Sequence, residues 1–159
     1  MKVLFLDIDG VLNSEQLIRQ QQRYGIYDEA KCLEGIDVCQ LAKSNLLYVL
    51  DCIPELRVVV HSTRRKRFSL EEIAEAISIP LERFAGITDL DLRDKSQAIQ
   101  KWLSDHDVEK FVIVEDSPMY GFDKENLLYI DPTDGFLLTH AKRAVVILGG
   151  NNDKKLYLF

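Results

Sequence analysis

Two aspartates one residue apart stand directly after an apolar run near the start of the chain. Asp7 and Asp9 follow the apolar residues 3–6 and precede Gly10. The run predicts a buried strand, and residues i and i+2 of an extended chain point to the same side. Because two close carboxylates repel each other, the pair is costly unless a cation lies between them. We therefore expect a divalent metal with oxygen ligands here, and Mg²⁺ is typical where phosphate is also bound.

An Asp-x-Asp pair also has plainer explanations. Most such pairs are loop carboxylates without a shared function. An EF-hand calcium loop begins in the same way, but it requires an oxygen ligand and then a glycine where this chain has Val11 and Leu12. A helix would also precede such a loop, whereas an apolar strand pattern precedes Asp7. The meaning of the pair therefore depends on what the rest of the chain supplies.

Apolar segments alternate with helix-forming segments along the chain. The predicted strands cover residues 3–6, 56–61, 84–88, 111–114 and 127–130, and the predicted helices cover 33–50, 70–77, 95–103 and 139–148. Continuous apolar strands separated by helices are typical of a mainly parallel sheet covered on both faces. No repeat, linker or low-complexity segment divides the chain. We therefore expect a single α/β domain over residues 1–159.

Polar residues that suit phosphate chemistry occur where the predicted strands end. Open parallel sheets bind ligands outside the carboxyl ends of their strands. The polar residues at such ends, or at the start of a predicted helix, are Asp7, Ser62, Lys95, Glu115 and Asp116. Singly, each has an ordinary explanation, since a serine can cap a turn and a lysine in a first helical turn is usually solvated. Their common position predicts one shared site.

The segment Asp7-Ile8-Asp9-Gly10-Val11 resembles the motif that opens phosphotransferases of the haloacid dehalogenase-like (HAD) superfamily. The later motifs of that superfamily are similar in order: a strand-terminal Ser or Thr, a Lys at a helix start and an acidic pair, here Glu-Asp in place of Asp-Asp. The resemblance spans residues 3–116. It implies a three-layer Rossmann-like fold and a Mg²⁺-dependent phosphatase that works through an aspartyl-phosphate.

Each motif residue takes a role from that resemblance. Asp7 is the nucleophile, and Asp9 is the general acid/base that protonates the leaving alkoxide and later activates water. Ser62 donates to the phosphoryl oxygens, and Lys95 offsets their charge. The expected metal ligands are Asp7, Asp9, Glu115 and Asp116, with Asp116 the nearer ligand of the acidic pair.

The residues after the second predicted strand bear on the substrate. The run Ser62-Thr63-Arg64-Arg65 and the pattern from Lys95 to Leu103 look like those of small HAD domains in Swiss Army Knife RNA-repair proteins. That resemblance favours a polynucleotide end as the substrate. Thr63 replaces Ser62 as donor if the strand ends one residue later, and the basic run 64–67 has a plain reading as a solvated turn. The expected substrate-binding residues are Gly10, Thr63, Arg64 and Arg65.

The segments between the predicted strands limit what can cover the site. HAD phosphatases usually close over small substrates with a cap domain inserted after the first or third strand. Residues 13–55 and 88–110 each already hold a predicted helix, which leaves no room for a substantial cap. We therefore expect an open site, which favours a large substrate such as a nucleic-acid end or a phosphoprotein unless an oligomer partner covers it.

The composition indicates the class of protein, its general charge and its expected compartment. A chain of 159 residues with 47% apolar and 29% charged residues fits one soluble globular domain. Its net charge of −6 gives no general attraction to nucleic acid or anionic membrane, although a local basic patch can coexist with it. The three cysteines lack CxxC spacing and the three histidines lack metal spacing. No signal peptide or membrane span is visible, so we expect a cytoplasmic protein.

Two interpretations without catalysis are alternatives to the phosphatase. A response-regulator receiver module also has acids, a Ser or Thr and a Lys at strand ends, but its acidic pair follows the first strand. Here the first strand carries Asp-x-Asp and a later one carries the acidic pair, which disfavours a receiver. A phosphate-binding HAD-fold protein without turnover is the other reading, and nothing argues for it because every catalytic position is filled.

Overall fold

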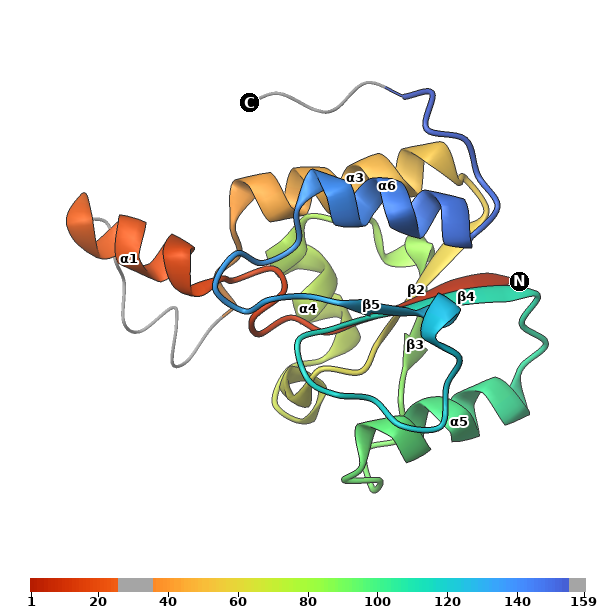
Figure 1. Cartoon of the computed structure of the whole chain (residues 1–159). Helices are drawn as coiled ribbons and strands as arrows, with labels where there is room; N and C mark the ends of the chain where they lie inside the picture. The colour runs from red at the N-terminus through yellow and green to blue at the C-terminus, as the bar shows by residue number, and fades with distance from the viewer. Residues whose placement is uncertain (26–35, 155–159) are drawn as a thin grey trace.

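The computed structural model describes residues 1–25 and 36–154 and contains a five-stranded, fully parallel sheet (Figure 1). The strand order is β3-β2-β1-β4-β5, so the first strand lies at the centre. The strands are β1 (Lys2–Leu6), β2 (Leu56–Val60), β3 (Phe84–Ile87), β4 (Lys110–Glu115) and β5 (Leu127–Tyr129). This confirms the predicted α/β class with a parallel sheet.

The register of the central strands determines which residues meet at the carboxyl edge. Leu6 pairs with Val60 on one side and with Val114 on the other. The pairing continues beyond β1, because the Asp7 amide donates to the Val114 carbonyl and the His61 amide donates to the Leu6 carbonyl, each at 3.1 Å. The side chains that follow the three strands therefore emerge next to one another.

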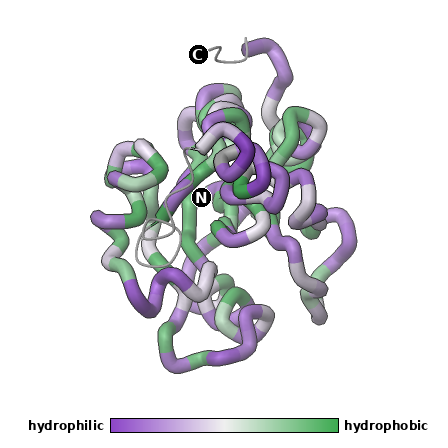
Figure 2. Tube along the Cα trace, turned by 90° about the vertical axis from the view of Figure 1, so that its left-hand side faces the viewer, coloured by the Kyte–Doolittle hydropathy of each residue, from purple (hydrophilic) through white to green (hydrophobic). Residues whose placement is uncertain are grey.

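Helices cover both faces of the sheet, which gives three layers (Figure 1). One face packs against α3 (Gln40–Cys52), α4 (Leu70–Ile77) and α6 (Leu138–Ile147). The other face packs against α5 (Lys95–Asp105), where Ile99 and Trp102 contact Phe5 and Ile113. Green and purple segments alternate along the helical turns in Figure 2, as expected of helices with one buried face.

Local signals in the sequence account for several helix boundaries. The Ser69 hydroxyl accepts from the Glu72 amide while the Glu72 carboxylate accepts from the Ser69 amide, which forms a capping box at the start of α4. The Asp94 carboxylate accepts from the amides of Ser96 and Gln97 and caps α5. The predicted helix over 33–50 is shifted: α3 begins at Gln40, and residues 33–35 lie outside the described part.

The segment after β1 contains a small polar helix, α1 (Glu15–Arg23), which projects beyond the carboxyl edge of the sheet (Figure 1). Short 3₁₀ turns complete the described elements: η1 (Thr63–Lys66), η2 (Leu81–Arg83) and η3 (Lys124–Asn126). Between β1 and β2 the described chain holds α1 and α3, and between β3 and β4 it holds α5. In the described residues, no helix has the length and apolar character needed to cross a membrane.

Candidate active site

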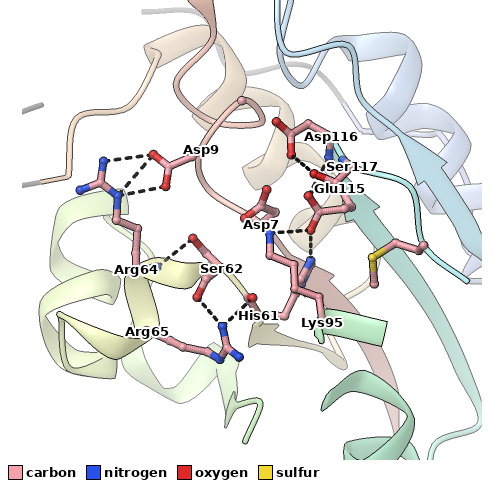
Figure 3. A network of polar contacts seen from close by, with 12 residues as sticks. Asp7, Asp9, His61, Ser62, Arg64, Arg65, Lys95, Glu115, Asp116 and Ser117 are labelled. Carbon is pink, nitrogen blue, oxygen red and sulfur yellow. Dashed lines mark hydrogen bonds and ion pairs between the residues drawn. The ribbon is translucent and has the colours of Figure 1, made fainter. Parts of the chain in front are cut away.

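The candidate site lies at the carboxyl edge of β1, β2 and β4, where polar side chains from distant parts of the sequence converge (Figure 3). Asp7 follows β1, Ser62 lies two residues after β2, and Glu115 is the last residue of β4. All three side chains are buried. Buried charged groups are rare unless they are paired or functional, so this cluster is the candidate active site.

Lys95 joins the two buried carboxylates. It is the first residue of α5, and its Nζ lies 3.4 Å from Asp7 Oδ1 and 3.1 Å from Glu115 Oε2. The Asp94 carboxylate caps the first turn of this helix. Burial alone would lower the pKa of Lys95, but the charges of Asp7 and Glu115 outweigh it and raise the pKa. The ammonium group therefore stays charged beside the predicted nucleophile.

Glu115 accepts hydrogen bonds on both oxygens. Its Oε1 accepts from the backbone amides of Asp116 and Ser117, at 3.1 and 3.2 Å. Its Oε2 accepts from Lys95 and lies 2.6 Å from Nε2 of His61, an imidazole that is completely buried. His61 had no predicted role, since its spacing to the other histidines suggested no metal site. The sequence signal was its place directly before Ser62 at the end of an apolar strand.

The carboxylate of Asp9 turns away from Asp7 and toward Arg64 (Figure 3). Arg64 Nε lies 3.0 Å from Asp9 Oδ2, Arg64 Nη2 lies 3.1 Å from Oδ1, and Asn13 Nδ2 donates to Oδ1 at 3.0 Å. Burial would raise the pKa of Asp9, but the bonds from Arg64 and Asn13 and the Arg64 charge outweigh it and lower the pKa. The side chain of Asp9 is thus paired with Arg64 and is not grouped with the other predicted metal ligands.

Gly10 makes room for the acidic pair. Its φ of +80° lies in the region that favours glycine, and a Cβ built there would collide with Asp116 Oδ2 and lie 2.9 Å from Asp116 Cγ. The carboxylate of Asp116 is therefore held against the backbone of the Asp-x-Asp loop. Gly10 is a predicted substrate-binding residue, and its lack of a Cβ lets the backbone of the Asp-x-Asp loop lie close to Asp116, which no other residue type allows here.

Ser62 and Thr63, the two candidate phosphate donors, have different environments. Ser62 is buried, and its Oγ accepts from the Arg64 amide at 3.2 Å, which caps η1. Accepting that bond leaves the hydroxyl hydrogen to donate elsewhere. Thr63 is exposed. Because β2 ends at Val60, one residue before the predicted end, the geometry favours Ser62 as the donor.

Arg65 does not lie at the rim of the site, contrary to the expectation that it binds substrate. Its side chain is 3% exposed, and among the described residues its guanidinium donates to backbone carbonyls. The acceptors are the carbonyl oxygens of His61, Ser62, Thr88, Asp89 and Leu92, at 3.0 to 3.4 Å. Arg65 therefore ties the chain after β2 to the chain after β3.

The buried carboxylates are poised for a cation. Burial, and secondly the charge of Glu115, raise the pKa of Asp7 from 3.8 to about 8. Among the described residues, ligand atoms of Asp7, His61 and Glu115 all lie within 4.8 Å of one another. Ionised Asp7 is costly in the metal-free protein, and a bound Mg²⁺ ion would offset that cost. The oxygen donors present, including Asp116 beside Gly10, fit a magnesium ion.

The comparisons with known proteins identify a family. The family model described as "HAD domain in Swiss Army Knife RNA repair proteins" matches residues 3–141. That range contains the whole site from Asp7 to Asp116. The comparisons with curated proteins and with solved structures found no match. Because the family model covers most of the chain, the protein belongs to the HAD domains of Swiss Army Knife RNA repair proteins.

Proposed function

We propose that the protein is a Mg²⁺-dependent phosphatase that hydrolyses phosphate monoesters through an aspartyl-phosphate on Asp7. The observation that carries this proposal is the position of Asp7: buried at the end of the central strand, with a lysine ammonium 3.4 Å from its Oδ1. A nucleophilic carboxylate needs such a nearby cation, since its target is itself anionic. Membership of the HAD family supports the same reaction class.

The reaction proceeds in two displacements. In the first, an Asp7 oxygen bonds to phosphorus, the bond from phosphorus to the leaving oxygen breaks, and Asp9 gives its proton to that oxygen. In the second, water attacks the phosphorus of the aspartyl-phosphate, Asp9 takes a proton from the water, and the bond to Asp7 breaks to release phosphate. Ser62 and Lys95 hold the phosphoryl oxygens throughout.

Asp7 and Asp116 would hold Mg²⁺, which would supply positive charge next to the phosphoryl group.

Arg64 has to change partner for the first displacement. While it binds the Asp9 carboxylate, Asp9 stays ionised and cannot act as an acid. An entering phosphate offers Arg64 a second anionic partner of matching geometry. Arg64 thus binds substrate and releases Asp9, which takes up a proton from solvent before it acts as the acid.

A polynucleotide end is the substrate class that we propose. The family is named for RNA repair. Lys66 and Arg67 are exposed one turn beyond Ser62, where the phosphates next to a terminal one would pass. In the described residues, the segment between β1 and β2 holds α1 and α3, and the segment between β3 and β4 holds α5, with no cap domain in either, so we expect the site to accept a large substrate.

Trapping the intermediate tests the reaction class. The protein is mixed with a phosphate monoester and Mg²⁺, quenched in acid and digested. The peptide that contains Asp7 is expected to carry one additional phosphoryl group that hydroxylamine removes, because hydroxylamine cleaves acyl phosphates. Turnover without any acid-trapped, hydroxylamine-sensitive phosphate on that peptide would remove the aspartyl-phosphate from the mechanism.

A further inference from the structure

We propose that His61 is a positioning residue: it fixes the carboxylate of Glu115, and Glu115 in turn aims the ammonium of Lys95 at Asp7. This inference rests on the proposed function, because it concerns how the cation beside the nucleophile is held. His61 is completely buried, and its Nε2 lies 2.6 Å from Glu115 Oε2 (Figure 3). His61 lies 54 residues from Glu115 in sequence: it follows β2, whereas Glu115 ends β4, and β1 lies between these two strands in the sheet.

The hydrogen-bond capacity of Glu115 is fully used. A carboxylate has about four acceptor positions, two on each oxygen. In the described residues Oε1 faces the amides of Asp116 and Ser117, while Oε2 faces Lys95 Nζ and His61 Nε2. These four partners occupy the hydrogen-bonding positions of Glu115 in the metal-free protein. We therefore expect Asp116 to be the nearer metal ligand of the acidic pair.

The second ring nitrogen of His61, Nδ1, has a free-energy cost in the folded protein. Nδ1 is buried and has no hydrogen-bond partner among the described residues. A buried polar atom without a partner costs on the order of 1–3 kcal/mol. An apolar side chain at this position would avoid that cost and complete the core below it. A histidine at this place is therefore explained by what Nε2 does for Glu115 rather than by packing.

Lys95 needs such guidance because its side chain is long. Four rotatable bonds let the ammonium reach solvent as well as the site, and ordering them costs side-chain entropy. Glu115 Oε2 anchors the ammonium at 3.1 Å, on the side from which it also reaches Asp7 Oδ1. If His61 released Oε2, the carboxylate would be free to rotate about its own terminal bond, and the Lys95 anchor would move with it.

Two amide variants distinguish this role from simple packing. The amide nitrogen of glutamine reaches the position of histidine Nε2, whereas that of asparagine reaches only the position of Nδ1. We expect His61→Asn to lower kcat for p-nitrophenyl phosphate by about tenfold and His61→Gln to stay within about threefold of wild type. KM should change less than kcat. Equal losses in the two variants, with similar midpoints of thermal unfolding, would overturn the proposal.

A double-mutant cycle tests whether His61 acts through Lys95. In a Lys95→Met background, His61→Asn should change kcat, or the Kd for inorganic phosphate measured by calorimetry, by less than about twofold. A tenfold loss that persists without Lys95 would contradict the proposal. Val145→Ala is the control, since this fully buried residue of α6 is remote from the site and should lower stability but not kcat.

A variant that does not fold and a wild-type protein without activity each require a different measurement. If His61→Asn does not fold, His61→Gln is compared in the wild-type and Lys95→Met backgrounds. Full activity of His61→Gln, or a loss of activity only where Lys95 is present, supports the proposal. Equal losses in the two backgrounds overturn it. If wild-type protein hydrolyses no phosphate monoester, the proposed function fails by itself. Crystal structures then decide the positioning role, which requires that Lys95 Nζ stays within hydrogen-bond distance of Glu115 in His61→Gln and moves away in His61→Asn.

Discussion

Arg64 and Asp9 form a two-pronged ion pair, in which the Nε and Nη2 atoms of the guanidinium bind the two oxygens of the carboxylate at 3.0 and 3.1 Å. Bidentate pairs of this kind are among the stronger charged hydrogen bonds. Two of the residues assigned to substrate and to proton transfer are therefore bound to each other in the free protein. Under the proposed function, phosphate binding to Arg64 would release Asp9 through this one contact.

The acid role of Asp9 predicts a dependence on the leaving group. Asp9→Asn should lose far less activity with an aryl phosphate, whose phenolate leaves unaided, than with an alkyl phosphate, whose alkoxide needs a proton. The measurement is kcat/KM for both ester types in wild type and variant. If both esters lost activity by the same factor, Asp9 would not be the general acid.

Asp7→Asn should abolish phosphatase activity while the fold remains intact. The carboxamide has nearly the same shape but is not a nucleophile, and it removes one charge from a buried acidic cluster. Circular dichroism and thermal unfolding establish the fold, and phosphate release measures activity. Activity within a few-fold of wild type, with deamidation of the new side chain excluded by mass spectrometry, would contradict the proposed nucleophile.

The sequence predicted the positions of the strand ends well, because buried parallel strands are continuous apolar runs with clear limits. Once β1, β2 and β4 are placed side by side, Asp7, Ser62 and Glu115 must lie at one edge. The family resemblance added roles to residues that the topology had already brought together. The sequence alone therefore predicts the fold class and the sheet edge at which these residues lie.

The sequence does not predict which side chains contact each other in the site. Arg64 and Arg65 are neighbours in one basic run, yet η1 turns by about 120° per residue, so one faces Asp9 and the other enters the protein. The pairing of His61 with Glu115 joins two strands that are far apart in sequence. Neither contact leaves a spacing that a single sequence displays, because both depend on the register between strands.

Arg65 provides a prediction about stability. Arg65→Met should lower the free energy of unfolding by more than about 3 kcal/mol, because several buried carbonyl groups lose their donor. Urea unfolding followed by circular dichroism measures the change. Lys66→Met, an exposed neighbour in the same turn, is the control and should change stability by no more than about 0.5 kcal/mol. Similar unfolding midpoints for both variants would show that Arg65 does not tie the two loops together.

The raised pKa of Asp7 predicts how the metal-free protein responds to pH. Because the pKa is about 8 when folded and 3.8 otherwise, the folded state retains a proton that the unfolded state releases. That contribution is complete below pH 3.8 and is lost as the pH rises through 8. In EDTA, wild type should therefore lose stability relative to Asp7→Asn between pH 5 and about 8.5.

Adding Mg²⁺ at the alkaline end should restore wild type more than Asp7→Asn, because the ion binds the ionised carboxylate. Both effects are read from urea unfolding at matched ionic strength. His61, whose pKa burial lowers to about 3, is neutral in both states above its usual 6.5 and contributes no slope there. A stability difference between the two proteins that is independent of pH would contradict the buried, proton-retaining Asp7.

The polynucleotide reading predicts a specific effect of two exposed cations. Lys66→Gln combined with Arg67→Gln should raise KM for an oligonucleotide with a terminal phosphate and leave p-nitrophenyl phosphate turnover unchanged. Phosphates next to the terminal one would lose their partners, whereas a small ester never reaches them. The dependence of log KM on log salt concentration should flatten by about one unit for each lost phosphate contact. Lys142→Gln with Arg143→Gln, an exposed pair of the same charge on α6, is the matched control and should change neither substrate. If the oligonucleotide KM and its salt dependence were the same in both double variants, the phosphatase would stand without a nucleic-acid substrate.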